Sequence, residues 1–420
     1  MRVFHDRPYV IADAILNTMG SMQHTFGVRE LIRAGLQDLD KARELLQELQ
    51  DNGVSDDRLQ SLMATLEHSC DPDVALRNLI DIIKALQSQC RRFDDIVTSG
   101  EGLTRLVTVL GVSDEMGKLM RFRPELVAAA ANDACESHLY NHAQRRAHVL
   151  EAVGADPQES TMPKAGLPLS EAATALRQTY RKQLAAIMAQ DAMETDPTTI
   201  QPRISQELSD LADAALEGAL AIARNEIEGS EHVRFTIIGM GKLGAQELNY
   251  VSDVDLIYVV EPADPDTNGM TLNRIGTKLA TTLQRVCQSV IMGVAEPTLW
   301  QIDGGLRPEG KDGPLVRRLE SHEAYYEQWA ENWEFQALLK ARPVAGDPEL
   351  GKAYMDMTRP FVWTASKRDN FVYDCQQMRK RVEDLIPAPL KDREIKLGRG
   401  GLRDVEFTVQ MLQLVHSRSD

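Results

Sequence analysis

Apolar residues recur at helical spacing through the first third of the chain. Leucines between residues 38 and 50 fall on one face of an expected helix that Gly53 closes, and a second stripe follows over residues 76–86. Shorter stripes of the same period continue as far as Val149. Leucine stripes of this kind usually pack a core. The pattern therefore predicts an N-terminal helical region over residues 1–153 with little strand content.

The helical pattern is interrupted twice before the middle of the chain. Three prolines and two glycines in residues 154–169 exclude a continuous helix, so we expect a linker or an exposed loop there. Ser170 then caps a helix, and Pro197 and Pro202 break the pattern a second time. A longer helix follows and ends at Gly229.

The pattern changes to strand spacing in residues 235–260. Two mostly apolar runs flank a glycine-rich turn, and the second run is entered through Asp253 and Asp255. The order predicts a strand, a glycine turn, a short helix and a second strand. Because side chains alternate along a strand, the two aspartates lie on one face, about 6.6 Å apart along the chain. Two such carboxylates repel each other unless a cation lies between them, so the pattern indicates a metal site.

Beyond this stretch, helical spacing returns. An amphipathic helix ends at Gly293, a strand is expected over residues 298–303, and a helix is expected over residues 321–341. This last helix carries Trp329 and Trp333 on one side. We expect the two tryptophans to pack a core, with stacking on an adenine ring as the less favoured alternative.

Asp303 ends the expected strand and adds a third carboxylate. In nucleotidyl transfer, two metals about 3.5 to 4 Å apart, held by carboxylates, stabilise both the entering and the leaving oxygen at phosphorus. Such a site needs two carboxylates on one strand and a third from a neighbouring strand. Asp253, Asp255 and Asp303 meet that description, so they are the predicted catalytic residues and metal ligands.

The glycine-rich turn beside the carboxylates is suited to holding phosphate. Backbone N–H groups of such a turn, and the N-terminus of the helix that follows, bind phosphate oxygens. Lys242 lies in the turn, and Arg307 follows Asp303 by four residues, where it could neutralise phosphate charge. The candidate binding residues are Gly239, Gly241, Lys242, Gly244, Ser252 and Arg307.

Several alternatives use the same residues. The three glycines also form the G-x-G-x-x-G fingerprint of a dinucleotide-binding oxidoreductase, with Glu261 at a suitable distance to hold a ribose, but that site leaves Asp253 and Asp255 without a role. The Ser-Asp-x-Asp stretch could instead be a solvated turn, and Asp303 could be an ordinary turn residue. Lys242 and Arg307 could be surface charges without a ligand.

His138 and His142 stand at the HxxxH spacing of a zinc site. Leu139 occupies the place where a zinc protease carries its glutamate, so the HExxH motif is absent. We expect surface or packing histidines rather than zinc ligands.

Composition narrows the class of protein. The chain has 47 basic and 63 acidic residues and a net charge of −16, which argues against non-specific binding to nucleic acid. Its five cysteines form no CxxC pair and are expected to be reduced. The first residues lack the apolar stretch of a signal peptide, and no run approaches the length of a membrane span. We expect a soluble, cytoplasmic protein without nucleic-acid or membrane partners.

Residues 239–257 closely resemble the nucleotidyltransferase motif of the bifunctional glutamine synthetase adenylyltransferase/adenylyl-removing enzymes. Three further stretches match this family in order, namely residues 303–310, 336–347 and 396–407. The resemblance covers roughly residues 95–420. One departure is Gly305, where many relatives carry an arginine, so a phosphate contact at that position is lost or supplied by another residue.

The resemblance implies a fold and a division of the chain. It implies an α+β, predominantly helical protein with a polymerase-beta-like nucleotidyltransferase core, built on a small mixed sheet and flanked by helical regions. We expect an N-terminal helical region over residues 1–153, the core with its flanking helices over residues 170–395, and the start of a truncated C-terminal helical domain over residues 396–420. The family carries two such cores per full chain, of which one is present here.

The resemblance also implies an activity. In the family, the N-terminal core removes AMP from a tyrosine of glutamine synthetase by phosphorolysis and gives ADP, whereas the C-terminal core adds AMP from ATP. The position near the start of the chain and the Glu247-Leu-Asn249 wording favour the removing copy. The adding reaction and a non-catalytic regulatory module remain alternatives.

The implied cofactor is Mg²⁺, held by Asp253, Asp255 and Asp303. The implied partners are adenylylated glutamine synthetase and the PII signalling protein, with inorganic phosphate, ADP and ATP as small molecules.

Overall fold

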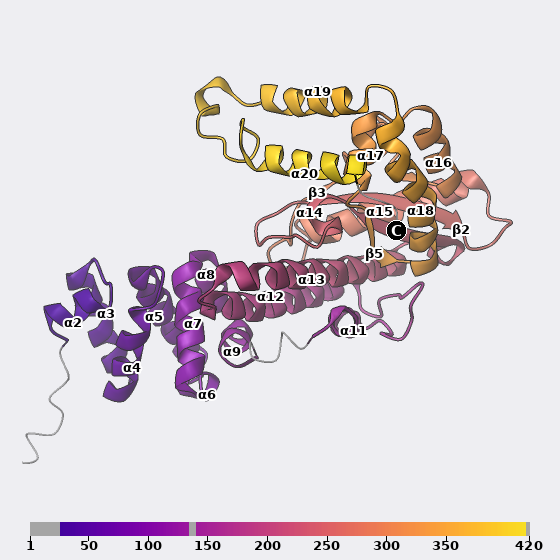
Figure 1. Cartoon of the computed structure of the whole chain (residues 1–420). Coiled ribbons are helices and arrows are strands. Elements are labelled where there is room, and N and C mark those ends of the chain that lie inside the picture. The colour runs from indigo at the N-terminus through magenta and orange to yellow at the C-terminus, as the bar shows by residue number, and fades with distance from the viewer. Residues whose placement is uncertain (1–25, 134–139, 417–420) are drawn as a thin grey trace, which may run out of the picture. The chain divides into compact units, whose positions relative to one another are not determined.

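A computed structural model of the chain describes residues 26–133 and 140–416 (Figure 1). These residues form two compact units. The first unit lies within Met1–Ser137 and Ala185–Thr195, and the second within His138–Leu184 and Asp196–Asp420. The sequence grouped residues 1–153 together, but helix α11 (His142–Ala152) packs against α13 (Pro197–Glu226) and clusters with the second unit.

The first unit is helical throughout its described part. Polar side chains at helix N-termini, such as Asp38, Ser55 and Asp71, accept backbone N–H bonds and set where the helices begin. The helices expected over residues 38–50 and 76–86 are confirmed. The helices of this unit are α2 (Val28–Arg33), α3 (Leu39–Asp51), α4 (Asp56–Leu66), α5 (Pro72–Ser88), α6 (Phe93–Ile96), α7 (Gly100–Val112), α8 (Asp114–Phe122), α9 (Pro124–Ala128) and the π-helical turn Ala129–Asp133.

The second unit is built around a mixed sheet. Its strands lie in the order β3-β2-β1-β5, and β4 also pairs with β2. Strand β1 is antiparallel to both β2 and β5, whereas β3 and β4 run parallel to β2. The strands are β1 (Val233–Gly239), β2 (Val254–Pro262), β3 (Ile302–Asp303), β4 (Val316–Arg317) and β5 (Arg342–Gly346).

Helices cover this sheet and bury its strands. Ile238 and Val259 belong to a core shared with the helices that follow β4, while Phe235 and Tyr258 contact each other within the buried part of the two central strands. Because both kinds of position are buried, the strands read as continuous apolar runs rather than as alternating ones. The helices of this unit are α11, α12 (Leu169–Met193, as far as Leu184), α13, α14 (Gly241–Gly244), α15 (Gly269–Gln288), α16 (Leu319–Gln328), α17 (Asn332–Leu338), α18 (Pro348–Thr364), α19 (Phe371–Asp384) and α20 (Leu402–His416).

The predicted fold class is confirmed, because helices predominate around a small mixed sheet. The dinucleotide-binding alternative is contradicted by the strand direction. That site requires parallel strands, but β1 and β2 are antiparallel, with Gly239 opposite Leu256 and Arg234 opposite Glu261. Glu261 therefore lies at the other end of the hairpin from the glycine turn. It accepts hydrogen bonds from Arg318 and from the backbone N–H of Leu319.

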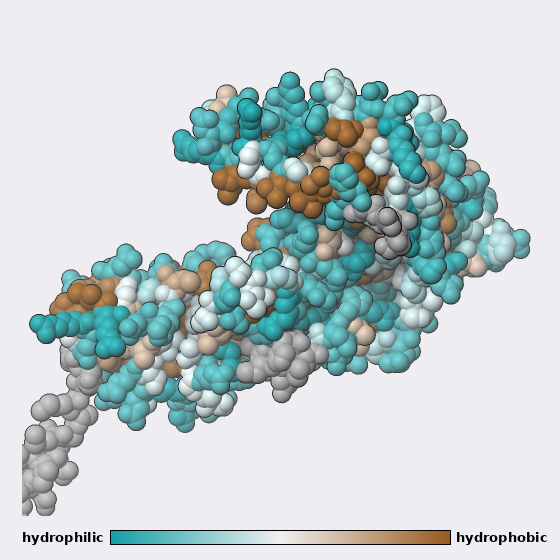
Figure 2. All heavy atoms as spheres, viewed as in Figure 1, coloured by the Kyte–Doolittle hydropathy of each residue, from teal (hydrophilic) through white to brown (hydrophobic). Residues whose placement is uncertain are grey.

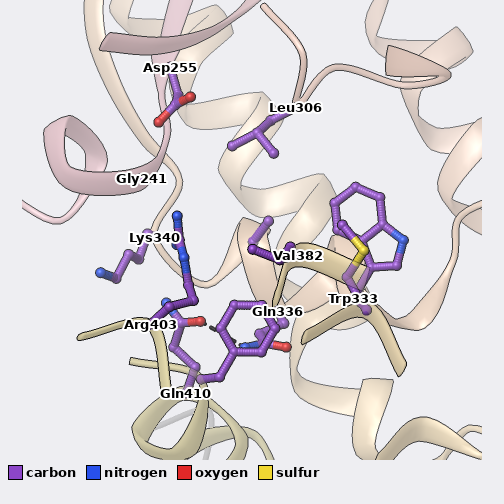
Figure 3. A pocket seen from close by; sticks show the side chains of 12 residues that line it. Gly241, Asp255, Leu306, Trp333, Gln336, Lys340, Val382, Arg403 and Gln410 are labelled. Carbon is purple, nitrogen blue, oxygen red and sulfur yellow. Dashed lines mark hydrogen bonds between the residues drawn. The ribbon is translucent and has the colours of Figure 1, made fainter. Parts of the chain in front are cut away.

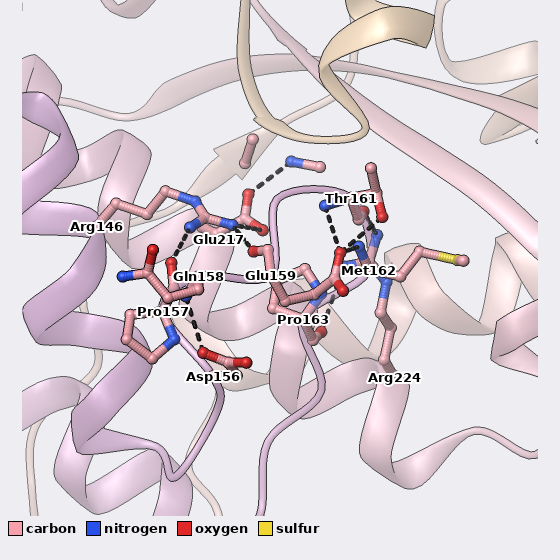
Figure 4. A network of polar contacts seen from close by, with 12 residues as sticks. Arg146, Asp156, Pro157, Gln158, Glu159, Thr161, Met162, Pro163, Glu217 and Arg224 are labelled. Atoms are coloured by element: carbon pink, nitrogen blue, oxygen red, sulfur yellow. Dashed lines mark hydrogen bonds and ion pairs between the residues drawn. The ribbon is translucent and has the colours of Figure 1, made fainter.

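The proline-rich stretch after α11 forms neither helix nor strand, as predicted, but it is not a free linker. Arg146 donates a 2.6 Å hydrogen bond to the carbonyl oxygen of Glu159, and buried Arg224 donates to the carbonyl oxygens of Thr161 and Pro163 (Figure 4). Carbonyl oxygens thus satisfy guanidinium groups that burial would otherwise leave unpaired. The loop is fixed onto α11 and α13.

Three other predicted elements differ in their bounds. The second break is present but shorter than expected, because α12 ends at Met193 and α13 begins at Pro197. Pro197 occupies the first position of α13, where a free N–H is not needed, and Pro202 is accommodated in its second turn. The strand expected over residues 298–303 is reduced to its last two residues. The helix expected over residues 321–341 is divided into α16 and α17.

Apolar side chains remain exposed along α20, where Figure 2 shows a hydrophobic band. Among the described helices, none combines the length and the apolar character needed to cross a membrane. The four cysteines that the structure describes are free, and Cys135 lies outside the described residues.

Candidate active site

The structure brings the three predicted aspartates together at the start of β2. Asp255 and Asp303 are Cα partners in the parallel ladder of β2 and β3, and Asp253 lies two residues before Asp255. Burial first, and then the charges of Asp253 and Asp303, raise the pKa of Asp255 to about 6. A half-buried carboxylate between two others is destabilised in its ionised form, and a cation among the three would remove this penalty.

The donor set fits a magnesium ion. Within residues 26–133 and 140–416, no group of three Asp, Glu, His or Cys side chains is already arranged to bind a metal ion. Mg²⁺ does not require one, because it keeps several waters and is usually bound through one or two carboxylates and the substrate phosphates. In this structure Asp303 Oδ1 accepts a 2.7 Å hydrogen bond from the backbone N–H of Gly305.

Gly241 contacts the carboxylate of Asp255 directly. Its φ is +53°, and a Cβ at this position would lie 2.5 Å from Asp255 Oδ2. The backbone N–H of Met240 donates a 2.8 Å hydrogen bond to the carbonyl oxygen of Asp255, which fixes the turn against β2. Only glycine allows the turn to approach the carboxylate this closely.

The other two glycines of the turn serve packing. A Cβ at Gly239 would lie 2.6 Å from Val344 Cγ1, and a Cβ at Gly244 would lie 1.9 Å from the carbonyl oxygen of Lys340. Both glycines therefore allow β5 and the residues before it to lie close to the turn. Of the three glycines expected to bind phosphate, Gly241 is the one at which an added Cβ would meet the Asp255 carboxylate.

The three polar residues expected to bind phosphate make local contacts. Lys242 is exposed, and its Nζ donates to Asn249. Ser252 Oγ donates to the carbonyl oxygen of Asp253. Arg307 donates to carbonyl oxygens of its own loop, including a 2.7 Å hydrogen bond to Gly304. The roles assigned to these side chains in phosphate binding stay predictions.

A cavity of about 210 Å³ opens beside Asp255 and Gly241 (Figure 3). Its lining includes two cations, Lys340 and Arg403, that our sequence analysis did not assign to the site. Glu406 joins them, because its carboxylate accepts a 2.7 Å hydrogen bond from Lys340 Nζ and a 2.8 Å hydrogen bond from Arg403 Nη1. Lys340 lies in residues 336–347 and Arg403 in residues 396–407, two of the stretches that resemble the family, and this position could have pointed to both residues.

The tryptophan prediction is wrong. Helix α16 ends at Gln328, so Trp329 and Trp333 do not share one helix face. Trp329 is 73% exposed, whereas Trp333 lines the cavity beside Asp255. Neither side chain belongs to the buried core.

His142 contacts an acidic residue. Its Nε2 lies 3.4 Å from Asp213 Oδ2, and a hydrogen bond to this carboxylate raises the pKa of His142. His138 and Leu139 lie outside the described residues, so the structure does not test the HxxxH spacing.

Comparison with known families gives two matches. Residues 103–357 match the profile of the glutamate-ammonia ligase adenylyltransferase family. Residues 376–420 match the profile of the GlnD PII-uridylyltransferase family. The first match covers the whole sheet, its glycine turn and the three aspartates, and it fits the polymerase-beta-like nucleotidyltransferase core that the resemblance implied.

Curated relatives carry one name, bifunctional glutamine synthetase adenylyltransferase/adenylyl-removing enzyme. A protein of this name from Bifidobacterium longum (strain DJO10A) is 75% identical over 391 residues, which are 93% of this chain and 36% of the relative. Relatives from Cutibacterium acnes and Streptomyces coelicolor are 43% and 41% identical over 93% and 96% of this chain, and over 39% and 38% of their own length. The chain thus spans little more than a third of each.

Proposed function

Because the chain belongs to the glutamate-ammonia ligase adenylyltransferase family, we propose that its core removes AMP from the adenylylated tyrosine of glutamine synthetase by phosphorolysis and releases ADP. The relatives are named for adding and for removing adenylyl groups on glutamine synthetase. The Glu247-Leu-Asn249 wording resembles that of the removing copy in this family and supports removal.

The observation that carries this proposal is the cluster of carboxylates at the start of β2. Burial and two neighbouring carboxylates raise the pKa of Asp255. Because Gly241 has no side chain, the glycine turn can lie directly against the Asp255 carboxylate. Asp253, Asp255 and Asp303 would hold Mg²⁺, which supplies positive charge beside the phosphorus atom.

The proposed reaction does not need a strong general acid. In the proposed reaction an oxygen of inorganic phosphate attacks the phosphorus of the AMP group, and the bond from that phosphorus to the tyrosine oxygen breaks. The products are ADP and a phenolate, which takes a proton from water. Tyrosine has a pKa of about 10, so it leaves without a strong general acid. The task of the site is to orient the phosphates and to balance their charge, to which Arg403 would contribute.

The alternative is that the same core catalyses the adding reaction, which is also in the relatives' name and which releases pyrophosphate from ATP. In that case the chain would transfer AMP from ATP to unmodified glutamine synthetase. A regulatory role for the PII signalling protein is part of the proposal only through the family resemblance.

We expect Asp253→Asn to abolish turnover of adenylylated glutamine synthetase, because it removes one of the three carboxylates that would hold the metal. The variant should also bind Mg²⁺ more weakly by calorimetry, and its circular dichroism should be unchanged. Asp266→Asn, in the exposed loop after β2, is the matched control and should keep full activity. Retained turnover in Asp253→Asn would exclude the metal role of this residue.

A further inference from the structure

The cavity beside Asp255 has a charged end and an apolar end (Figure 3). We propose that it binds the adenosine 5′-phosphate part of the substrate, with the phosphate beside Asp255 and Arg403 and the adenine ring against Trp333 and Phe407. This inference rests on the proposed function, and it adds the residues that recognise the nucleotide.

Arg403 is the cation best placed for the phosphate. In Figure 3 its side chain extends toward Asp255, and its charge acts on that carboxylate. The Arg403 side chain is 33% exposed. Among the described residues, its guanidinium donates one hydrogen bond, to Glu406. A guanidinium has five N–H donors, so several remain for phosphate oxygens.

Lys340 has a different task. Its Nζ lies between the carboxylates of Glu247 and Glu406, at 2.8 and 2.7 Å. The lysine thereby holds Glu406 in place, and Glu406 in turn orients Arg403. We therefore assign Lys340 as a positioning residue and Arg403 as the phosphate contact.

The other end of the cavity suits a planar ring. Trp333 and Phe407 lie in its lining, together with apolar side chains of α19. Trp333 Nε1 donates a 2.8 Å hydrogen bond to Glu331, which restrains the indole. Bases stack on aromatic side chains of this kind. The Arg403 guanidinium lies over the Phe407 ring, 6.0 Å from its centroid, so Phe407 connects the phosphate end with the base end of the cavity.

Gln336 carries an unused acceptor at this end. Gln336 is 2% exposed and lines the cavity, and its Nε2 donates to Gln410. Its carbonyl oxygen receives no hydrogen bond from the described residues. The terminal torsion of a glutamine is soft, so a small rotation presents this oxygen to the cavity. The exocyclic amino group of adenine is a donor that would satisfy it, whereas hypoxanthine offers a carbonyl oxygen at that position.

Nucleotide binding tests the proposal separately from turnover. Adenosine and ADP are titrated into the chain by calorimetry, without metal and with Mg²⁺. Trp333→Ala should weaken both ligands about tenfold, the scale of one lost base-stacking contact. Trp329→Ala removes the exposed tryptophan nearby and should bind both ligands as the parent chain does. Trp333→Phe should recover most of the affinity, because it keeps a ring.

The phosphate and base contacts predict different patterns. Arg403→Gln should weaken ADP but leave adenosine unchanged. ADP should bind more tightly than inosine diphosphate, and Gln336→Leu should remove this preference. Equal affinities in Trp333→Ala and Trp329→Ala, or equal affinities for ADP and inosine diphosphate in the parent chain, would overturn the assignment. Absence of ADP formation from glutamine synthetase together with these binding patterns would instead reject the proposed reaction and retain the nucleotide site.

Discussion

Asp255, which we propose to hold the metal, destabilises the fold when no cation is bound. Its carboxylate is half-buried, lies beside Asp253 and Asp303, and fills the space above Gly241. Without a cation, the three negative charges repel one another, so part of the stability of the fold is given up at this point. Asp253→Asn relieves one repulsion, and we therefore expect the metal-free variant to be no less stable than the parent chain while being inactive.

His322 provides the pH dependence at the residue scale. It is buried between Tyr326 and Tyr354, with ring centroids 6.0 and 5.2 Å away. Burial, followed by the charge of Arg317, lowers the pKa of His322 to about 3. An unfolded histidine has a pKa of about 6.5, so the unfolded chain binds this proton more readily. The stability that neutral His322 contributes is therefore complete above about pH 6.5 and is lost as the pH falls toward 3.

We expect the parent chain to lose about 2 kcal/mol more than His322→Phe between pH 6.5 and 5.0, because only the parent takes up this proton on unfolding. Urea unfolding at the two pH values measures the difference. Equal losses in the two proteins would contradict a buried neutral histidine.

The residues of the site differed in how far the sequence could place them. Asp255 lies in β2 and Asp253 directly precedes that strand, so their spacing alone put them together, and Asp303 followed from the expected strand that it ends. Lys340 and Arg403 could not be found in that way. They lie 63 positions apart on separate elements, and tertiary packing alone brings both to the cavity.

At the scale of elements, the glycine turn is held by β5. Arg342, at the start of β5, donates to the carbonyl oxygens of Leu243 and Gly244 at 3.0 and 3.2 Å. The same guanidinium makes a bidentate ion pair with Asp213 of α13, at 2.5 and 3.1 Å. The side chain of Asp213 is 0% exposed. One arginine thus ties α13, β5 and the turn that carries Gly241.

Asp213→Asn is expected to lower the free energy of unfolding by about 3 kcal/mol, because it leaves a largely buried guanidinium without its charged partner. Urea unfolding measures this loss. Lys352→Ala removes an exposed ion pair with Asp356 and is the control, expected to change the free energy of unfolding little. A similar small change in both variants would show that the pair does not anchor the turn.

Elements were predictable where local signals marked them. The N-cap side chains and leucine stripes of α3 and α5 gave their positions from sequence. The break between α16 and α17 contains no glycine or proline. The Glu334 carboxylate accepts a 2.9 Å hydrogen bond from the backbone N–H of Glu331, and among the described residues the Glu331 side chain makes no cap hydrogen bond of the kind that Ser, Thr, Asp or Asn makes at a helix N-terminus. Spacing alone therefore predicted one continuous helix and grouped Trp329 with Trp333.

At the scale of the molecule, strand direction separates the two classes of nucleotide site. Glycine spacing alone fits both, and apolar runs do not reveal whether strands are parallel. The antiparallel pairing of β1 with β2 excludes the dinucleotide fold, while β3 running parallel to β2 adds the third aspartate. The family match agrees with this core, and the chain spans 36% of its Bifidobacterium relative.

The central claim is removal of AMP by phosphorolysis, and radiolabelled inorganic phosphate tests it most directly. The chain is incubated with adenylylated glutamine synthetase, Mg²⁺ and the labelled phosphate, and the nucleotide products are separated. We predict that the label appears in the β-phosphate of ADP and that Asp253→Asn abolishes this product. Unlabelled AMP as the product would indicate hydrolysis, and AMP transfer from ATP to unmodified glutamine synthetase without labelled ADP would indicate the adding reaction. Either result would contradict the proposal.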